Sequence, residues 1–393
     1  MEGLEERLGA LSIARRSCPD EPTYLLDMSL QTSGLLAVSC SNFNVHLHNK
    51  DTLRLLGEYR GHSGPLCGVT FAHKTPDLLY SGSADGTVRA WDVRRPGSEA
   101  VHTFKSDPVH IFCSFDVNCS DVLLCAGTEQ VDDEDSYLVF WDVRKPGSGI
   151  LGVYTESHSD DVTQVRFHPL DKDRLASGST DGLVNVFDVS QGAEEEALLA
   201  TCNSDSSAGG VCWSGPGYTQ LLCLSHDEGL HLWDLNRLDT DEPLTVFSTT
   251  DARSLTPLAD GGSVDYLVGG QWLEDVQKLL VVGGRSNGEL HLLQCDDGGL
   301  RLLRSLEGGH ASTVRCFAWD ATGEGLITGG EDAQLLLWKP GGEEITMGKK
   351  ASMKSESALR LKSRPHKKHG YQRDKTTTQQ TDKLKTKMKT DKI

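Results

Sequence analysis

Seven short segments along the chain share one pattern, and their regular spacing constrains the fold more than any other feature. Each segment is rich in apolar residues and has a Trp, or a residue in the Trp position, near its end, and these positions are 48, 91, 141, 187, 233, 293 and 338. The spacings between them are 43, 50, 46, 46, 60 and 45 residues. Such a period with a Trp-Asp ending is typical of four-stranded blades arranged radially. The sequence therefore predicts an all-β propeller with seven blades.

A second pattern recurs before several of these segments. Residues 81–88 read SGSADGTV and residues 177–184 read SGSTDGLV, so the copies agree at six of eight positions, and residues 328–335 (TGGEDAQL) are a third version. Asp-Gly favours a tight turn, and the alternating residues around it favour strands. Farther upstream lie the dipeptides Gly61-His62, Ser157-His158 and Gly309-His310. Together these patterns resemble the WD40 repeat family, and the resemblance extends over roughly residues 11–340.

The resemblance implies a buried, hydrogen-bonded set of one His, one Ser or Thr, one Asp and one Trp within a blade. Such a set is expected because a polar group that leaves water must find a partner inside the protein. The matching positions are His62, Ser81, Asp85 and Trp91 in blade two; His158, Ser177 and Asp181 in blade four, where Phe187 replaces Trp; and His310, Thr328, Asp332 and Trp338 in blade seven. We expect no complete set in blades one, three and six.

The two ends of the repeat region predict how the ring closes. The last copy finishes near Pro340 with only three strands, and residues 11–17 (LSIARRS) alternate apolar and polar side chains. This N-terminal strand can supply the missing outer strand of the last blade, which removes an exposed sheet edge. We therefore expect a short N-terminal extension at 1–10, a closed propeller at 11–340 and a tail at 341–393.

Charge divides the chain in the same way. The protein has 39 Lys and Arg against 57 Asp and Glu, a net charge of −18. Residues 347–393 contain 15 basic and 4 acidic residues, which leaves 24 basic and 53 acidic residues, a net of −29, for 1–346. The tail has few apolar side chains to bury, so we expect it to be disordered. Its basic clusters at 364–369 and 383–389 predict nuclear import, nucleolar retention or loose RNA contact, or else a merely solubilising tail.

Cysteine usage and hydropathy indicate the compartment. The eleven cysteines are scattered without a Cys-x-x-Cys pair, which favours free thiols in a reducing environment. We find no secretory signal peptide after Met1 and no stretch of 18 apolar residues, so we expect no membrane span. These features predict a protein of the cytoplasm, the nucleus or both.

The known motifs of catalysis and of metal or cofactor binding do not occur in the sequence. There is no Gly-x-x-x-x-Gly-Lys-Ser/Thr, no His-Glu-x-x-His and no Gly-x-Ser-x-Gly. His226 and His231 lie on either side of an expected hairpin, which argues against a shared metal ion. We therefore expect no enzyme activity, no cofactor and no metal.

Acidic residues cluster in the expected loops. Asp132, Asp133, Glu134 and Asp135 form an insertion before the third Trp-Asp, and residues 159–161 open blade four on the same expected face. Glu194–Glu196 and residues 239–242 are expected on the opposite face. One hypothesis is a docking surface for a basic partner, and the alternative is that exposed loops are simply charged.

A sharper interaction signal follows two consecutive repeats. Trp91, Asp92 and Arg94 form a Trp-Asp-x-Arg motif, and Trp141, Asp142 and Arg144 form another. This motif resembles the signature of WD40 substrate receptors of cullin-RING ubiquitin ligases, in which the Arg helps to dock the ring on the ligase's propeller adaptor. A guanidinium is suited to this role because its planar fork pairs with carboxylates or carbonyls.

These observations predict a non-enzymatic protein-interaction scaffold that works as a monomeric ring within a larger complex. The first alternative is a ubiquitin-ligase substrate receptor that uses Arg94 and Arg144. The second is an RNA- or ribosome-associated factor that uses its basic tail.

Overall fold

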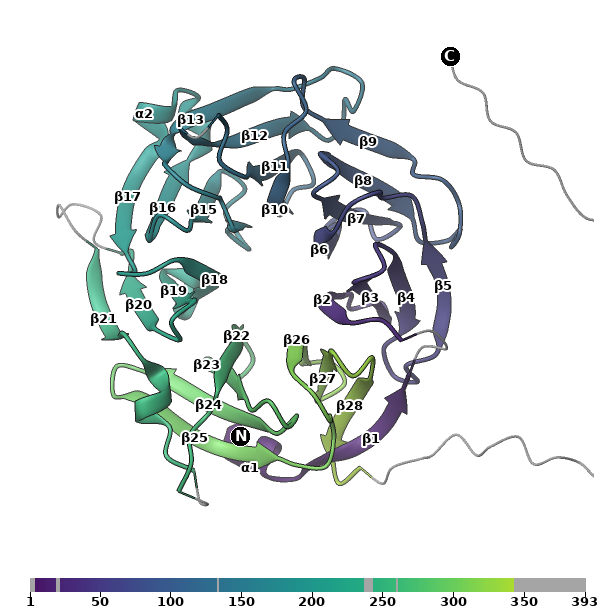
Figure 1. Cartoon of the computed structure of the whole chain (residues 1–393), viewed down its shortest axis with the longest axis vertical. Helices are drawn as coiled ribbons and strands as arrows, with labels where there is room; N and C mark the ends of the chain where they lie inside the picture. The colour runs from purple at the N-terminus through teal and green to yellow at the C-terminus, as the bar shows by residue number, and fades with distance from the viewer. Residues whose placement is uncertain (1–3, 19–21, 133, 237–242, 259–260, 343–393) are drawn as a thin grey trace, which may run out of the picture. The chain divides into compact units, whose positions relative to one another are not determined.

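The computed structural model describes residues 4–18, 22–132, 134–236, 243–258 and 261–342. Within them, 28 strands form seven four-stranded antiparallel sheets, and the sheets stand as blades around a common centre (Figure 1). The predicted seven-bladed, all-β propeller is therefore confirmed. Residues 343–393, where we expect the basic tail, lie outside the described residues.

Each blade places its strands in chain order from the centre outward, except the last. The strands are, for blade one, β2 (Leu25–Leu30), β3 (Leu35–Cys40), β4 (Val45–Asn49) and β5 (Leu55–Tyr59); for blade two, β6 (Leu66–Phe71), β7 (Leu78–Ser83), β8 (Thr87–Asp92) and β9 (His102–Lys105); for blade three, β10 (Phe112–Val117), β11 (Leu123–Thr128), β12 (Ser136–Asp142) and β13 (Gly152–His158); for blade four, β14 (Gln164–Phe167), β15 (Arg174–Gly178), β16 (Leu183–Asp188) and β17 (Leu198–Asn203); for blade five, β18 (Ala208–Ser214), β19 (Gln220–Ser225), β20 (Leu230–Asp234) and β21 (Leu244–Thr249); for blade six, β22 (Tyr266–Leu273), β23 (Lys278–Gly284), β24 (Leu290–Asp296) and β25 (Gly299–Leu306); and for blade seven, β26 (Val314–Asp320), β27 (Gly325–Gly330), β28 (Leu335–Pro340) and β1 (Leu11–Ser17).

Burial changes from the middle of each blade to its outer edge. In β7, the side chains from Leu79 to Ser83 are buried, because neighbouring blades cover both faces of the sheet. In the outer strand β5, Leu55 and Leu56 are exposed instead. The second and third strands therefore read as nearly continuous apolar runs, whereas the outer strands do not.

The hydrophobic core is divided into clusters that lie between consecutive blades. Trp91 of blade two, for example, packs with Val45, Leu47 and Tyr59 of blade one, and the Tyr59 and Trp91 ring centroids are 5.3 Å apart. Each blade thus covers the apolar face of the next, which is why a single blade could not be stable alone.

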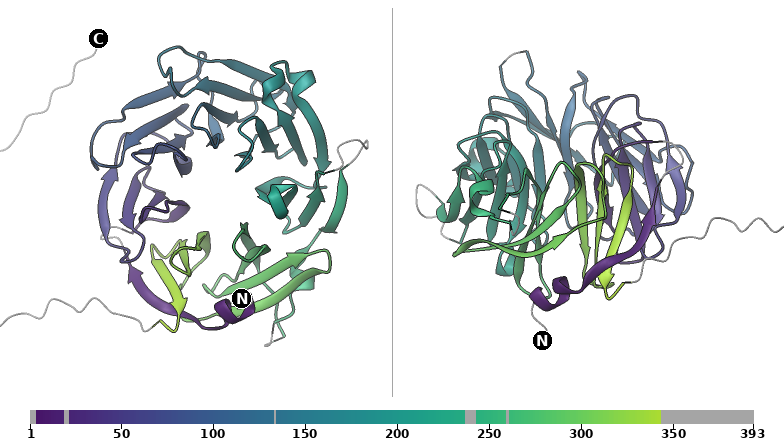
Figure 2. Two further views of the ribbon diagram at one scale, coloured as in Figure 1. Left: turned by 180° about the vertical axis from the view of Figure 1, so that it is seen from behind. Right: turned by 60° about the horizontal axis from the view of Figure 1, so that its bottom comes forward.

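The N-terminal strand closes the ring as predicted. β1 pairs antiparallel with β28, from Leu11 opposite Pro340 to Ser17 opposite Leu335, with a bulge after Ile13. Figure 2 shows β1 lying alongside β28 at the outer edge of the last blade. The first and last strands of the propeller therefore share one sheet.

Two further contacts at this closure were not predicted. A short helix, α1 (Leu4–Gly9), packs its buried Leu4 and Leu8 in the cluster of blades six and seven. The buried side chains of Lys50 in blade one and Asp320 in blade seven form an ion pair at 2.7 Å. Both contacts join residues far apart in the sequence, so neither leaves a local signal.

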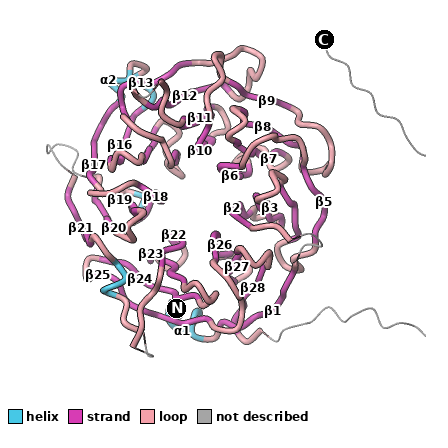
Figure 3. The backbone as a smooth tube through the Cα atoms, in the orientation of Figure 1, coloured by secondary structure: helices cyan, strands magenta, loops and turns pink. Residues whose placement is uncertain are grey.

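Helix contributes little to the described chain, as Figure 3 shows. The other α-helix is α2 (Glu194–Ala197), and three short 3-10 segments lie at η1 (Val189–Gln191), η2 (Pro216–Tyr218) and η3 (Ala252–Leu255). Among the described helices, none is long and apolar enough to cross a membrane.

Candidate protein-interaction surfaces

In blade two, four side chains form a continuous hydrogen-bonded chain. Trp91 Nε1 donates to Ser81 Oγ at 2.8 Å, and the Ser81 hydroxyl donates to His62 Nε2 at 2.8 Å. His62 Nδ1 donates in turn to the Asp85 carboxylate at 3.0 Å. A carboxylate only accepts hydrogen bonds, so the proton of the neutral imidazole lies on Nδ1. The chain fixes the loop before the blade against the Asp-Gly turn within it.

Burial and hydrogen bonding set the charge of this chain. Burial lowers the pKa of His62, although Asp85 acts in the opposite direction, so the imidazole is neutral at pH 7. Burial alone would raise the pKa of Asp85, but donors from Thr87, Ser63 and His62 outweigh it and lower the pKa. These groups are therefore structural partners of one another.

Blades four and seven contain the same arrangement. His158 lies 3.0 Å from Asp181 and 2.7 Å from Ser177, and Phe187 closes the set without an indole donor. In blade seven, His310 lies 3.0 Å from Asp332 and 2.8 Å from Thr328, to which Trp338 donates at 3.0 Å. The resemblance placed these residues together, and the structure brings them together.

The remaining blades lack the hydroxyl at the centre of the chain. The strand pairing shows which residues are equivalent to Ser81, and they are Val38, Ala126, Cys223 and Gly283 in blades one, three, five and six. In blades one, five and six, a buried His faces this position across the ladder, and these residues are His46, His231 and His291. Nδ1 of His231 bonds Ser248 and Nδ1 of His291 bonds Ser305, each at 2.9 Å. His46 and His291 were not predicted, and His231 was considered only as a metal ligand, although an aliphatic-His-Leu pattern marks all three.

The two Trp-Asp-x-Arg motifs end in loops of the same backbone structure. Arg95 N–H donates to the Asp92 carbonyl in one loop, and Lys145 N–H donates to the Asp142 carbonyl in the other, both at 3.0 Å. In each loop the Asp side chain also holds the Arg by two hydrogen bonds, at 2.8 Å for Arg94 and 2.9 Å for Arg144. The bonds from Arg94 lower the pKa of Asp92 to about 2. Both guanidinium groups are thus held in one orientation.

The two arginines remain open to solvent but differ in their neighbours. The side chain of Arg94 is 64% exposed and that of Arg144 is 63% exposed. Arg94 Nη1 also pairs with Asp77 at 3.0 Å, whereas Arg144 has no second carboxylate within 4 Å in the part of the chain that the structure describes. The position equivalent to Asp77 is Val122, since the two residues accept the same backbone bond from Val93 and Val143. Arg144 is therefore the less neutralised of the pair.

The other members of these motifs do not reach the surface. Trp91 is 0% exposed and Trp141 is 1% exposed, so neither can contact a partner while its blade is folded. Asp92 and Asp142 are also buried and serve to orient their arginines. Of the six residues of the two motifs, which the sequence marks as candidates for partner binding, only Arg94 and Arg144 present their side chains to solvent.

The acidic insertion of blade three is a folded turn. Val131 and Asp135 form an isolated bridge, and Asp132 takes a left-handed φ of 56°. Gln130 donates from its backbone N–H to Asp161 at 2.8 Å and from its side chain to the Ser159 carbonyl at 2.9 Å. The two acidic loops that we expected on one face therefore touch one another. Asp132 and Glu134 are exposed, Asp135 is half-buried, and Asp133 lies outside the described residues.

The acidic runs that we expected on the opposite face offer fewer free carboxylates for a docking surface within the described residues. Glu194 of α2 accepts hydrogen bonds from the backbone N–H groups of Thr155 and Glu156, so its carboxylate is occupied within the protein. Residues 239–242 lie outside the described residues. Across the described ranges, no group of three His, Cys, Asp or Glu side chains is placed to hold a metal ion.

Comparison with known proteins agrees with this architecture. The family model described as WD40 (WD domain, G-beta repeat) matches residues 53–92, 150–188 and 300–339. Each match begins near the outer strand of one blade and ends in the third strand of the next. The sequence repeat is therefore offset from the blade, and every repeat links two blades.

Full-length relatives extend the similarity. The chain is 31% identical to WD repeat-containing protein GTS1 of Arabidopsis thaliana, over 77% of this chain and 78% of that protein. It is 29% identical to a WD repeat-containing protein 89 homolog of Dictyostelium discoideum, over 82% of this chain and 84% of that protein. It is also 21% identical to DDB1- and CUL4-associated factor 13 of Danio rerio, over 72% of this chain and 66% of that protein.

Proposed function

Since the chain belongs to the WD40-repeat family, we propose that it acts as a non-enzymatic protein-interaction scaffold within a larger intracellular complex. Propellers of this family are in general scaffolds that bind other proteins. The loops of a rigid ring can engage several partners at once, which suits assembly. The eleven cysteines are all free thiols, which supports a reducing compartment such as the cytoplasm or nucleus.

The observation that carries this proposal is that the two ends of one strand carry fixed loops of opposite charge. The described acidic loop residues, 129–132, 134–135 and 159–161, lie at the start of β12, and Arg144 follows its end. Side chains that are already hydrogen-bonded in place lose little conformational entropy on binding. The protein therefore offers two preorganised surfaces. The acidic loops suit a basic partner, and the loop of Arg144 suits an acidic partner.

Affinity purification of the full-length protein from nuclease-treated cell extract, followed by mass spectrometry, tests the proposal. A scaffold should recover one or more proteins in near-stoichiometric amounts. Recovery of the protein alone, at salt near 0.15 M and without crosslinking, would contradict the scaffold function.

A second candidate function is substrate receptor of a cullin-RING ubiquitin ligase, and the clamped arginines favour it. Arg94 and Arg144 follow the third strands of consecutive blades, in loops of the same structure, so they can act together on one partner. One relative is named a DDB1- and CUL4-associated factor, and we extend that association to this chain only as a hypothesis. On this hypothesis the two guanidinium groups dock on carboxylates or carbonyls of the adaptor DDB1.

Binding of purified DDB1 to the full-length protein tests the receptor hypothesis. The Arg94→Glu/Arg144→Glu variant should lose binding, because it reverses both charges at the contact. Arg253→Glu is a matched control, since Asp251 holds Arg253 by the same pair of hydrogen bonds in another loop. Equal binding by the wild type and the double variant would remove this candidate.

A third candidate is an RNA- or ribosome-associated factor that acts through residues 347–393, whose net charge is +11. Binding that neutralises phosphates weakens steeply with salt, with a slope of about 0.7 per contact on single strands. RNA affinity should therefore fall between 0.05 and about 0.2 M salt, and deletion of 347–393 should abolish it. Salt-insensitive binding that survives the deletion would contradict this role of the tail.

A further inference from the structure

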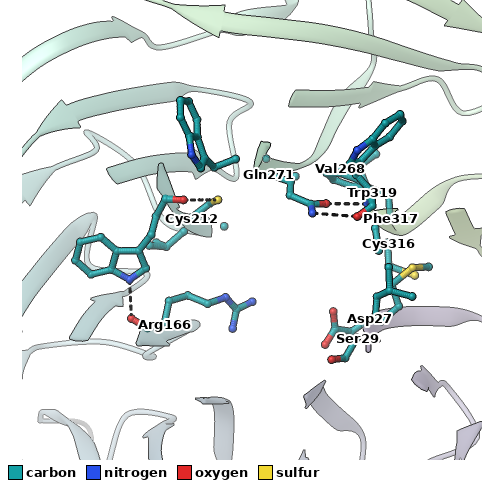
Figure 4. Close-up of a pocket in the computed structure, with 18 of the residues that line it drawn as sticks. Asp27, Ser29, Arg166, Cys212, Val268, Gln271, Cys316, Phe317 and Trp319 are labelled. Atoms are coloured by element: carbon teal, nitrogen blue, oxygen red, sulfur yellow. Dashed lines mark hydrogen bonds between the residues drawn. The ribbon is translucent and has the colours of Figure 1, made fainter. Parts of the chain in front are cut away.

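The centre of the propeller contains a cavity of about 830 Å³, and residues from six blades line it. Figure 4 shows the side chains that project into it from opposite walls. A volume of this size falls within the range of small-molecule sites in proteins, roughly 300–1,000 Å³. The cavity is separate from the loops at which we propose that proteins dock.

The walls of the cavity differ in chemistry. Arg166 of β14 and Asp27 of β2 bring opposite charges to the cavity from facing walls, as Figure 4 shows. Blades five to seven contribute Cys212, Val268 and Phe317. They also contribute Arg315 and Asp320, whose charges are paired with Glu331 and Lys50. A ligand that combines charged groups with an apolar body therefore matches Arg166 and Asp27 on one hand and Val268 and Phe317 on the other.

Arg166 has unused hydrogen-bonding capacity. Among the described residues, its guanidinium makes one hydrogen bond, from Nη1 to the carbonyl of Val165 at 3.1 Å, and no carboxylate lies within 4 Å of it. Figure 4 shows the group extending into the cavity toward the side where Asp27 and Ser29 lie. A guanidinium carries five N–H donors, so most of them face the interior of the cavity.

Two carboxylates, those of Asp27 and Asp116, interact electrostatically with Arg166 but form no ion pair with it among the described residues. Asp27 accepts the backbone N–H of Val69 at 3.0 Å, and Asp116 accepts that of Phe167 at 2.8 Å, so each connects its blade to a neighbour. Burial raises the pKa of both, while Arg166 acts in the opposite direction. These carboxylates would repel a simple anion, and Arg166 would repel a simple cation.

We propose that this cavity binds a free α-amino acid with an apolar side chain. The carboxylate of the ligand accepts from the Arg166 fork, and its ammonium group donates to Asp27 and Ser29. Arginine pairs with carboxylates through two parallel hydrogen bonds, which fixes the orientation of the ligand. The side chain of the ligand then lies toward Val268 and Phe317. The site is independent of the scaffold function.

The competing explanation is that Arg166 only compensates the charge of Asp27 and Asp116. It predicts a structural role for the three residues and no ligand. The two explanations differ in binding, and three tryptophans that line the cavity, Trp213, Trp272 and Trp319, offer a fluorescence signal in addition to calorimetry.

The test is titration of the full-length protein with phenylalanine, leucine and methionine, with calorimetry and tryptophan fluorescence as readouts. For phenylalanine, 3-phenylpropanoate and 2-phenylethylamine are matched ligands that lack the ammonium group or the carboxylate. We expect each to bind at least about tenfold more weakly than phenylalanine, because each leaves one buried charge of the site unpaired. Equal binding by the three compounds, or no binding of any amino acid at about 10 mM, where even a weak site would respond, would overturn the proposal.

Variants separate binding from folding. Arg166→Gln should weaken phenylalanine binding at least about tenfold, and Asp27→Asn, which keeps an acceptor for the Val69 N–H, should do the same. Arg315→Gln is the matched control, since Arg315 lines the same cavity but pairs with Glu331. Binding that survives both site variants, or that the control abolishes equally, would overturn the assignment of the site.

Discussion

Blades two and three both carry Trp-Asp-Val-Arg at the end of the third strand, and they differ in what surrounds it. In blade two, Trp91 donates to Ser81, and Arg94 lies between Asp92 and Asp77. In blade three, Trp141 Nε1 is buried without a partner among the described residues, and Arg144 pairs with Asp142 alone.

The difference originates at two positions outside the motif. Ala126 stands where blade two has Ser81, so Trp141 has no hydroxyl beneath it and instead packs edge-on against Phe112, with ring centroids 5.7 Å apart. Val122 stands where blade two has Asp77, so Arg144 keeps one side open. In blade two, the Trp and Arg of the motif are both bound to further residues of the protein and so stabilise the blade. In blade three, Arg144 keeps one side open to a partner.

The largest expected effect breaks the hydrogen-bonded chain of blade two. His62→Ala removes two buried hydrogen bonds, the one from Ser81 and the one to Asp85, and leaves a cavity where the imidazole was, so we expect a loss of about 3 kcal/mol. His110→Ala in the loop before blade three should cost less than about 1 kcal/mol, because its ring packs against Tyr137 and is not part of such a chain. Urea unfolding followed by tryptophan fluorescence measures both. Equal costs would contradict the comparison.

A pH effect of similar size extends the comparison to blade one. Burial lowers the pKa of His48 to about 4, from an ordinary value of 6.5. Between pH 6.5 and 4, His48 therefore binds a proton in the unfolded protein but not in the folded protein. Stability should be unaffected above pH 6.5 and fall by about 3 kcal/mol between pH 6.5 and 4.

Thermal unfolding across this pH range, for the wild type and for His48→Gln, checks the prediction. Glutamine has no proton to gain, so the variant should show a smaller loss of stability. His62, whose pKa burial also lowers, adds a loss of the same sign. Parallel pH profiles for the two proteins would show that His48 is not a source of the acid sensitivity.

A feature of this structure could be predicted from the sequence when it depends on residues close together in the chain, and not when it depends on contacts between distant residues. The blade repeats and the closing strand at Leu11–Ser17 follow from local patterns and could be predicted, and the partners of His62 follow from the family resemblance that those patterns carry. The Lys50–Asp320 pair and the contact of Asp77 with Arg94 depend on how strands meet in space, and no local pattern encodes them. The missing partner of Trp141 was accessible in principle, because Ala126 aligns with Ser81 once the blades are superposed.

A smaller effect separates the two arginines in binding. If the protein docks on DDB1 as the receptor hypothesis holds, Arg144→Glu should weaken binding more than Arg94→Glu, by about 30-fold against about fivefold. The reason is that Asp77 already neutralises part of the charge of Arg94. Surface plasmon resonance with purified DDB1 measures both, and Arg253→Glu is again the control. The reverse order would show that the second carboxylate strengthens the docking group.

The smallest expected effect is the change in stability when the hydroxyl is removed from blade two, by Ser81→Ala, or added to blade three, by Ala126→Ser. Ser81→Ala should cost about 1–2 kcal/mol, since it removes the acceptor of Trp91 and the donor to His62. Ala126→Ser should gain up to about 1 kcal/mol, because it gives Trp141 Nε1 an acceptor in a buried site. Unfolding midpoints of the two variants measure the exchange. A destabilised Ala126→Ser would mean that the packing around Trp141 has no room for the oxygen.

The central claim is that the protein is a scaffold whose exposed loops hold other proteins. The most direct test is quantitative affinity purification of the wild type and the Arg94→Glu/Arg144→Glu variant from the same nuclease-treated extract. The account predicts near-stoichiometric partners with the wild type, and the selective loss of those that dock at the two arginines in the variant. Recovery of the wild-type protein without any near-stoichiometric partner would contradict it.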